Sequence, residues 1–279
     1  MSKLYTLLLF LCIHNFGNAQ FTIQGEVIDV KTQKAIPYIN IGIIASSKGT
    51  VSDDEGRFVL TVESENDIVT FSGIGYETKN MAVREFVVQS WVALIPKEYA
   101  FEAVEIVANK FEEGNVILGV RNKNRGLSIG FGSAQLGTEI GAPIKIEKPS
   151  FLKTANFVFN HAKGDSVLLR VNIYELDDGV IGRNLLPENV IIREKQKKGK
   201  ISVNLEEYNL IVESDVLLTL EWLRDFDENG NKGLTFDTKK SKKPRGVFVR
   251  YSSNGAFKKT HAMKKRKLCF YFEASQTEE

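Results

Sequence analysis

The stretch GEVIDVKTQKAIPYINIGIIASSKGTVSDDEGRFVLTVESENDIVTFSGIGY, residues 25–76, decides the fold class of this chain. Short runs rich in β-branched and other apolar residues alternate in it with turn-forming residues, of which Asp53-Asp54-Glu55-Gly56 is the clearest group. Strands this short, with turn signals this frequent, predict an all-β sandwich. The predicted strands are 25–29, 38–44, 50–52, 57–62 and 68–72.

Several motifs in this stretch resemble a known family. They are G-x-V-x-D from Gly25, A-I-P-Y-I-N-I from Ala35, G-T-V-S-D-D-E-G-R-F from Gly49 and F-S-G-I-G-Y-E from Phe71. Together they resemble the carboxypeptidase-like regulatory (CarboxypepD_reg-like) domain of Bacteroidetes envelope proteins. The resemblance covers about residues 21–97 and implies a prealbumin-like β-sandwich over 20–97, closed by a last strand within 85–95. It implies a module and an envelope setting, and it names no reaction.

The N-terminus has the pattern of a signal peptide. Lys3 precedes an apolar run over 4–13, and Gly17-Asn18-Ala19 supplies the small residues that a signal peptidase reads. We therefore expect residues 1–19 to be removed and the protein to be exported, to the periplasm, the outer membrane or the cell exterior. A buried N-terminal element is the alternative. Lipoprotein processing at Cys12 is a second one, but Leu11 is not the small residue that it needs.

Composition narrows the class of partner. Hydrophobic residues make up 43% of the chain and charged residues 26%, as in soluble globular proteins. A formal net charge of +2 gives no global electrostatic attraction to nucleic acid, so we expect no nucleic-acid partner. No segment after the signal peptide approaches the ~20 apolar residues of a transmembrane helix. Cys269 would be the remaining cysteine, and its apolar surroundings predict a buried side chain rather than a reactive thiol.

The middle of the chain links two predicted domains. Residues 98–108 are acidic and rich in valine, and they resemble the segment that follows the same module in TonB-dependent receptors. We interpret 98–115 as an edge strand and linker. The resemblance implies an outer-membrane protein partner of the TonB-dependent transporter type.

The remainder predicts a second all-β domain over 116–274, followed by a tail at 275–279. Glycines are frequent over 119–141, but the G-x-G-x-x-G spacing of a nucleotide loop is absent, and we expect them to let twisted strands pack closely. About eight antiparallel strands suggest a jelly-roll-like sandwich whose sheets each have one buried and one solvated face. The predicted strands are 151–159, 166–174, 189–194, 201–205, 216–223, 246–251 and 268–272.

One acidic segment is a candidate metal site. Asp225, Asp227, Asn229 and Asn231 match the first half of a calcium loop, D-x-D-x-N-G. The twelfth position, where that loop has a bidentate glutamate, is Phe236. Asn229-Gly230 is also a strong hairpin turn, and the sequence favours a turn over a weak calcium site. Apart from this calcium, we expect no cofactor.

No catalytic motif stands out. After signal removal the histidines are His161 and His261, and neither begins the H-x-x-E pair of a zinc carboxypeptidase. A G-x-S-x-G nucleophile elbow is also absent. Paired glycosidase carboxylates cannot be identified from the sequence because acidic residues are plentiful.

Basic residues cluster near the C-terminus, at 239–245, 258–259 and 264–267. If these loops meet, they form a positive patch for an anionic envelope component such as a lipopolysaccharide phosphate or an acidic glycan. The alternative is that the lysines solvate turns and protect edge strands from aggregation.

The sequence therefore predicts a non-catalytic, exported accessory protein that binds an outer-membrane partner or a surface glycan. The alternatives are a hydrolase of envelope polysaccharide and a purely structural envelope protein.

Overall fold

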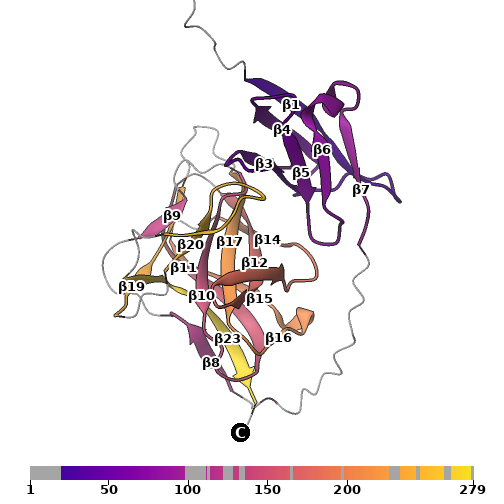
Figure 1. Ribbon diagram of the computed structural model, residues 1–279. Coiled ribbons are helices and arrows are strands. Elements are labelled where there is room, and N and C mark those ends of the chain that lie inside the picture. The colour runs from indigo at the N-terminus through magenta and orange to yellow at the C-terminus, as the bar shows by residue number, and fades with distance from the viewer. Residues whose placement is uncertain are drawn as a thin grey trace, which may run out of the picture.

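The computed structural model describes residues 20–97, 111, 114–121, 128–131, 136–163, 166–195, 198–225, 233–242, 246–260 and 265–277. This part of the chain consists of β-strands and two short 3-10 helices, arranged as two β-sheet bodies (Figure 1). The predicted all-β fold class is confirmed. None of the helices among these residues has the length and apolar character needed to span a bilayer.

The N-terminal body is a small β-sandwich. Its two sheets have the strand orders β4-β1-β7 and β3-β2-β5-β6. The alternation of apolar and polar residues explains the fold locally, because every second side chain of β4 is buried in the core. The elements are β1 (Phe21–Asp29), β2 (Asn40–Ile43), β3 (Gly49–Val51), β4 (Arg57–Val62), β5 (Ile68–Ser72), β6 (Lys79–Ala82), η2 (Val83–Val87) and β7 (Trp91–Leu94).

Turn chemistry shapes this body as the sequence predicts. The Asp53 carboxylate accepts hydrogen bonds from the backbone N–H groups of Glu55 and Arg57, at 2.9 and 2.8 Å. Gly56 has a φ of 73°, a left-handed conformation that suits glycine. These contacts form the turn that leads into β4.

The end of this sandwich differs from the predicted strand within 85–95. Residues 83–87 form the helix η2, because the Glu85 carboxylate accepts the Ala82 N–H at 2.8 Å and holds the first turn. This helix places the Phe86 ring against Phe58 and Phe71, with centroid separations of 6.0 and 5.9 Å. Only Trp91–Leu94 is a strand, and it pairs with β1 in parallel.

The C-terminal body is a larger sandwich of two seven-stranded sheets. One contains the path β13-β12-β17-β10-β20-β21 with β14 beside β12, and the other contains β8-β23-β11-β18-β9 with β15 and β16 beside β11. Neighbouring strands come from distant parts of the chain, as in a jelly-roll-like sandwich. The strands β19 and β22 form a separate two-stranded ribbon.

The elements of this body begin at Val116. They are β8 (Val116–Gly119), β9 (Ile129–Phe131), β10 (Glu139–Ile144), β11 (Ser150–Lys163), β12 (Val167–Asp177), β13 (Val180–Asn184), β14 (Val190–Glu194), β15 (Gly199–Asn204), η4 (Glu206–Tyr208), β16 (Ile211–Val212), β17 (Val216–Asp225), β18 (Gly233–Phe236), β19 (Thr238–Lys240), β20 (Phe248–Arg250), β21 (Lys258–Lys259), β22 (Arg266–Leu268) and β23 (Phe270–Gln276). The last strand extends two residues into the predicted tail.

The glycine-rich opening allows close strand packing, as predicted. A Cβ on Gly130 would lie 1.8 Å from the Leu234 carbonyl oxygen of the neighbouring strand. A Cβ on Gly141 would lie 2.5 Å from Cγ2 of Thr219. Gly141 belongs to β10, a strand that the sequence analysis missed and that lies in the middle of its sheet. Cys269 is buried, as expected, and so is Trp222.

Candidate functional site

Four charged residues form one row across four neighbouring strands of the larger body. Arg170 on β12 lies opposite Glu221 on β17, Glu221 lies opposite Glu139 on β10, and Glu139 lies opposite Arg250 on β20. Arg170 is 2% exposed, and both glutamates are completely buried. The two carboxylates are therefore direct neighbours inside the protein, with one arginine on each side.

Hydrogen bonds join the row into a network. Arg170 donates to Oε2 of Glu221 from Nε and Nη2, at 2.9 and 2.8 Å. The Asn172 amide donates to both carboxylates, at 2.9 Å to Glu139 and 3.2 Å to Glu221. Glu139 also accepts from Thr219, Tyr174 and Arg250. The network thus supplies donors to both oxygens of Glu139.

The pKa values in this network are perturbed by burial. Burial raises the pKa of the Glu139 carboxyl, the Arg250 cation opposes that shift, and the Glu221 carboxylate adds to it. Burial also raises the pKa of the Tyr174 hydroxyl. For Arg250, burial favours the neutral form, but Glu139, Tyr174 and Glu221 together outweigh burial and raise the pKa of the guanidinium.

Arg170 extends this network to the other body. Its Nη1 donates to the Tyr38 carbonyl at 2.7 Å, and its Nη2 donates to Oδ1 of Asn40 at 2.6 Å. A second contact comes from Asn254, whose amide donates to the carbonyls of Asn40 and Thr70, at 3.2 and 3.0 Å. Polar groups of both bodies are therefore used to hold the bodies together.

Close packing completes this interface. Val51 of the smaller body is buried in one cluster with Leu168 and Leu223 of the larger one. The segment after β20 approaches β2 so closely that a Cβ on Gly42 would lie 2.2 Å from the Ser253 carbonyl oxygen. Since Leu168 and Leu223 lie on the same face of the sheet as Arg170 and Glu221, that face is covered rather than solvated. The prediction that each sheet has one solvated face is wrong for this sheet. The first body and the chain after β20 exclude water from the face that was expected to be solvated.

The smaller body has an open groove on the sheet β4-β1-β7. The groove has a volume of about 750 Å³, and Leu136 of the larger body lines one side. Arg57, Glu26 and Trp91 lie in one row across the three strands that form its floor. Trp91 is 48% exposed, so an aromatic ring is available beside a carboxylate and a guanidinium. Such a lining can hold a ligand that has both apolar and hydroxyl-bearing surfaces.

The outer edge of β7, which lies beside this groove, has backbone carbonyl groups that already accept hydrogen bonds. The carbonyls of Ser90 and Leu94 accept from β1. On the opposite side, the Trp91 carbonyl accepts from the Gln89 amide at 2.7 Å, and the Ala93 carbonyl accepts from the Lys79 ammonium at 3.1 Å. The Ile95 carbonyl accepts from a backbone N–H at 2.9 Å. A peptide strand adding to this edge would have to displace these contacts.

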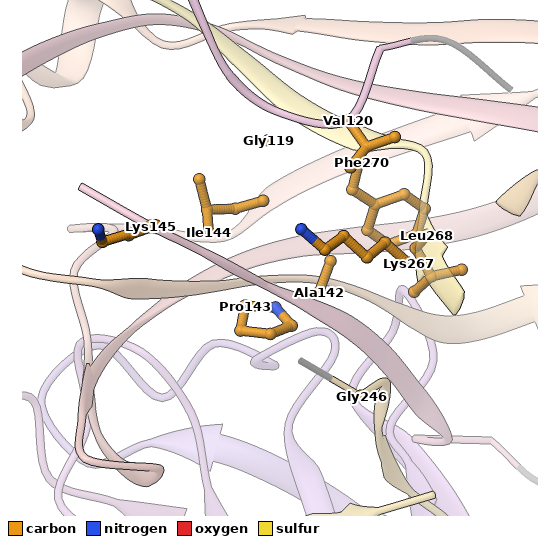
Figure 2. A pocket seen from close by; sticks show the side chains of 10 residues that line it. All are labelled: Gly119, Val120, Ala142, Pro143, Ile144, Lys145, Gly246, Lys267, Leu268 and Phe270. Carbon is orange, nitrogen blue, oxygen red and sulfur yellow. The ribbon is translucent and has the colours of Figure 1, made fainter. Parts of the chain in front are cut away.

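A second, smaller cavity lies in the larger body, between β8, β10 and the start of β23 (Figure 2). Its volume is about 150 Å³. Ala142, Pro143 and Phe270 line it together with Lys267 of β22, whose ammonium points across the cavity toward Ile144 in Figure 2.

Two of the predicted basic clusters meet beside this cavity. Lys239 lies opposite Lys267, and Lys240 lies opposite Arg266, in the ribbon formed by β19 and β22. Residues 243–245 and 261–264 lie outside the described part of the chain.

The N-terminal body matches a known domain family. Residues 23–103 match the family model of the CarboxypepD_reg-like domain. The match confirms the resemblance and, like it, covers only a segment of the chain. The family name describes a regulatory domain and not a catalytic one. The larger body, which begins at Val116, lies outside the match. No curated protein matches the chain.

The predicted calcium loop lies almost entirely outside the described residues. Asp225 is the last residue of β17, whereas Asp227, Asn229 and Asn231 fall within 226–232, of which nothing is described. Elsewhere in the described ranges, no group of three or more His, Cys, Asp or Glu residues could hold a metal ion. Calcium binding at 225–231 stays a prediction.

The sequence contains a signal for part of the carboxylate row, but that signal does not predict the row. Arg170 and Asn172 alternate with apolar residues in the strand 166–174, and Thr219 and Glu221 do the same in 216–223. That alternation is typical of a solvated face. The contacts with the CarboxypepD_reg-like domain and with the chain after β20 show that this face is buried.

Proposed function

We propose that this protein is an exported, non-catalytic accessory protein of the cell envelope that binds a surface glycan through its CarboxypepD_reg-like domain. The observation that carries the proposal is the open row Arg57–Glu26–Trp91 in a groove of about 750 Å³. The Trp91 ring offers an apolar face to a sugar ring, and the two charged side chains offer hydrogen-bond donors and acceptors to its hydroxyl groups.

The charges of the groove favour a neutral sugar. Arg57 lies opposite Glu26 but pairs with Asp53 and Glu55, so the groove lining carries more negative than positive charge and repels an acidic sugar. The capped edge of β7 argues against a peptide strand as the ligand at that edge. An outer-membrane partner of the TonB-dependent transporter type rests on the family resemblance alone and stays a prediction.

Affinity electrophoresis tests this function. The chain from Gln20 is run through gels that contain soluble neutral polysaccharides: a glucan, a mannan or a galactan. At least one of them should retard it, and Trp91→Ala should abolish the retardation. Tyr251→Ala is the matched control, because Tyr251 is also an exposed aromatic residue, at 56%, and lies on the larger body outside the groove. Absence of retardation by every polysaccharide, or retardation that survives Trp91→Ala, contradicts the proposal.

A hydrolase of envelope polysaccharide is the second candidate, and the adjacent carboxylates Glu139 and Glu221 favour it. Glycosidases use such a pair, with one carboxyl as acid and the other as base or nucleophile. Burial argues against this role, since each carboxylate is bound by an arginine and neither lines the groove or the cavity described above. Release of reducing sugar from the same polysaccharides, lost in Glu139→Gln, would establish the hydrolase instead.

A further inference from the structure

A second hollow lies next to the groove on the sheet β4-β1-β7. Its volume is about 480 Å³. Thr50, Val59 and Leu136 line both the hollow and the groove, so the two spaces are continuous. The other residues that line the hollow are Gln20, Lys48, Gly49, Leu60 and Thr61. We call the groove and the hollow together the extended cleft.

The exposed face of β4 runs from one space into the other. Arg57, Val59 and Thr61 are the exposed residues of this strand, and alternate side chains of a strand share a face. Arg57 lines the groove, Thr61 lines the hollow, and Val59 lines both. From Arg57 to Thr61 the strand rises by about 14 Å, at the usual rise per residue of an antiparallel strand. The extended cleft is therefore longer than a single sugar ring.

One wall of the extended cleft comes from the larger body. Leu136 supplies it, shortly before β10. The next residue, Gly137, donates its backbone N–H to the Trp222 carbonyl at 2.8 Å, which ties this segment to the larger body. Leu136 also packs against the apolar cluster that joins the two bodies. The extended cleft thus lies at the junction of the bodies, and the smaller body alone supplies only part of its lining.

Apolar and polar groups succeed one another along the extended cleft. Val59 is exposed and Leu136 is half-buried, so an apolar surface is available where the two spaces meet. In the hollow, the Lys48 ammonium can donate hydrogen bonds, and the Thr61 hydroxyl can donate and accept them. Lys48 pairs with Glu63 at 2.7 Å, so this end adds little net charge. A chain of neutral sugars offers the matching groups, apolar ring faces and hydroxyls.

Building on the glycan binding proposed above, we propose that the extended cleft binds an unbranched chain of neutral sugars. Successive rings lie on Trp91, at the junction between Val59 and Leu136, and beside Lys48 and Thr61. A single sugar or a disaccharide would fill only part of this length. A longer chain touches both bodies through Leu136, so its binding also favours their docked arrangement.

Calorimetric titration with sugars of increasing length is the first test. The probes are oligosaccharides of each polysaccharide used in the gels, from disaccharide to heptasaccharide, and the protein is the chain from Gln20. In at least one series the heptasaccharide should bind about tenfold more tightly than the disaccharide, or better, because further rings gain hydrogen bonds in the hollow.

Two results would overturn the extended cleft. One is equal affinity for the disaccharide and the heptasaccharide, with both lost in Trp91→Ala, because the glycan site then ends within the groove. The proposed function would survive that result. The other is a lack of binding by every oligosaccharide. Retardation of the chain by a polysaccharide, and its loss in Trp91→Ala, would still decide the proposed function separately.

A double variant tests the hollow by itself. Lys48→Met/Thr61→Val should weaken binding of the heptasaccharide about tenfold, from the usual contribution of two hydrogen bonds. It should leave binding of the disaccharide at Trp91 unchanged. Lys145→Met/Thr78→Val is the matched control, since Lys145 also pairs with a glutamate, Thr78 is also exposed, and neither lines the extended cleft. Equal binding of the heptasaccharide by both double variants would contradict the proposal.

Discussion

Arg170 and Asn40 belong to different bodies of the chain and are joined by a hydrogen bond of 2.6 Å from Nη2 to Oδ1. The same guanidinium binds the Glu221 carboxylate on the neighbouring strand. Its planar fork can serve both partners at once, which a lysine ammonium does less well. Docking of the CarboxypepD_reg-like domain and neutralisation of a buried carboxylate therefore depend on one side chain.

Replacing Arg170 by methionine should destabilise the protein strongly. The change leaves Glu221 buried without its cation and removes the contacts to Tyr38 and Asn40. Breaking a buried ion pair by removing one partner costs about 3–5 kcal/mol. Urea unfolding followed by tryptophan fluorescence measures the change.

The matched control for that experiment is Arg183→Met. Arg183 pairs with Glu175 at 2.7 Å, but its side chain is 77% exposed. A surface pair contributes only about 0–1 kcal/mol. Similar losses for Arg170→Met and Arg183→Met would show that the buried row is not a main source of stability.

The interface itself can be loosened at Gly42. Alanine there would place a Cβ 2.2 Å from the Ser253 carbonyl oxygen, and a backbone atom cannot move away cheaply. Overpacking of this kind costs about 1–3 kcal/mol. We expect Gly42→Ala to separate the two bodies, which faster proteolysis between them and a larger radius of gyration in X-ray scattering would reveal.

Gly114→Ala provides the control, since a Cβ on Gly114 would meet nothing within 4 Å. If both alanine variants keep the compact scattering profile of the parent, the contact between β2 and residue 253 does not determine how the bodies are held.

The strands of the first body were predictable because each is a local pattern. The ranges 57–62 and 68–72 agree with β4 and β5, since alternation and the Asp53–Gly56 turn define them without distant contacts. Helix η2 was missed because its stability depends on Glu85 capping Ala82 and on Phe86 meeting two other rings. The strand β10 was missed because Gly141 and Pro143 have low strand propensity, which pairing on both sides overrides.

The candidate sites were less predictable than the strands. Trp91 and Glu26 share a groove only because β7 pairs with β1 in parallel, a pairing between distant segments that no local pattern encodes. Glu139 and Glu221 become neighbours through the β10–β17 register. The sequence indicates the two basic clusters, but the position of Lys239 opposite Lys267 depends on the ribbon register.

The pH dependence of the free energy of unfolding should reflect the protonation of the Glu139 carboxyl. Its pKa is raised above 4.5 in the folded protein, mainly by burial, so the folded state favours the protonated form. The stabilisation that the protonated Glu139 carboxyl gives the folded state is fully present below pH 4.5. It is lost as the pH rises through the raised folded-state pKa. The difference in unfolding free energy between wild type and Glu139→Gln should therefore narrow as the pH rises above 4.5.

Glu63→Gln should behave in the opposite way. A hydrogen bond from Lys48 lowers the pKa of the Glu63 carboxyl below 4.5, so its contribution is present above that pH and is lost on acidification. The difference between wild type and Glu63→Gln should widen as the pH rises toward neutrality. Urea unfolding from pH 3.5 to 7 measures both variants. The same trend in both would contradict the assigned effect of burial on Glu139.

Calcium should stabilise the protein if the D-x-D-x-N-G segment is a binding loop rather than only a turn. Extracellular calcium modules bind with Kd values of about 10⁻⁴–10⁻³ M. At ten times Kd, binding to the folded state alone adds about 1.4 kcal/mol, which raises the unfolding midpoint by about 3–6 °C in a domain of this size. Scanning calorimetry of the chain from Gln20, first in EDTA and then in 10 mM calcium, measures the shift.

Asp225→Ala/Asp227→Ala should remove that shift, since it deletes two of the four oxygen-bearing side chains. Asp177→Ala should keep the calcium-induced shift. Asp177 ends β12 in a turn where Asp178 and Gly179 both have positive φ, as in a hairpin turn, and such a turn needs no metal. If calcium leaves the unfolding midpoint unchanged, the segment does not bind calcium. The reason would be that Phe236 stands where a calcium loop has its bidentate glutamate. A shift shared by all variants would indicate calcium binding elsewhere, and 225–231 would then be a hairpin turn.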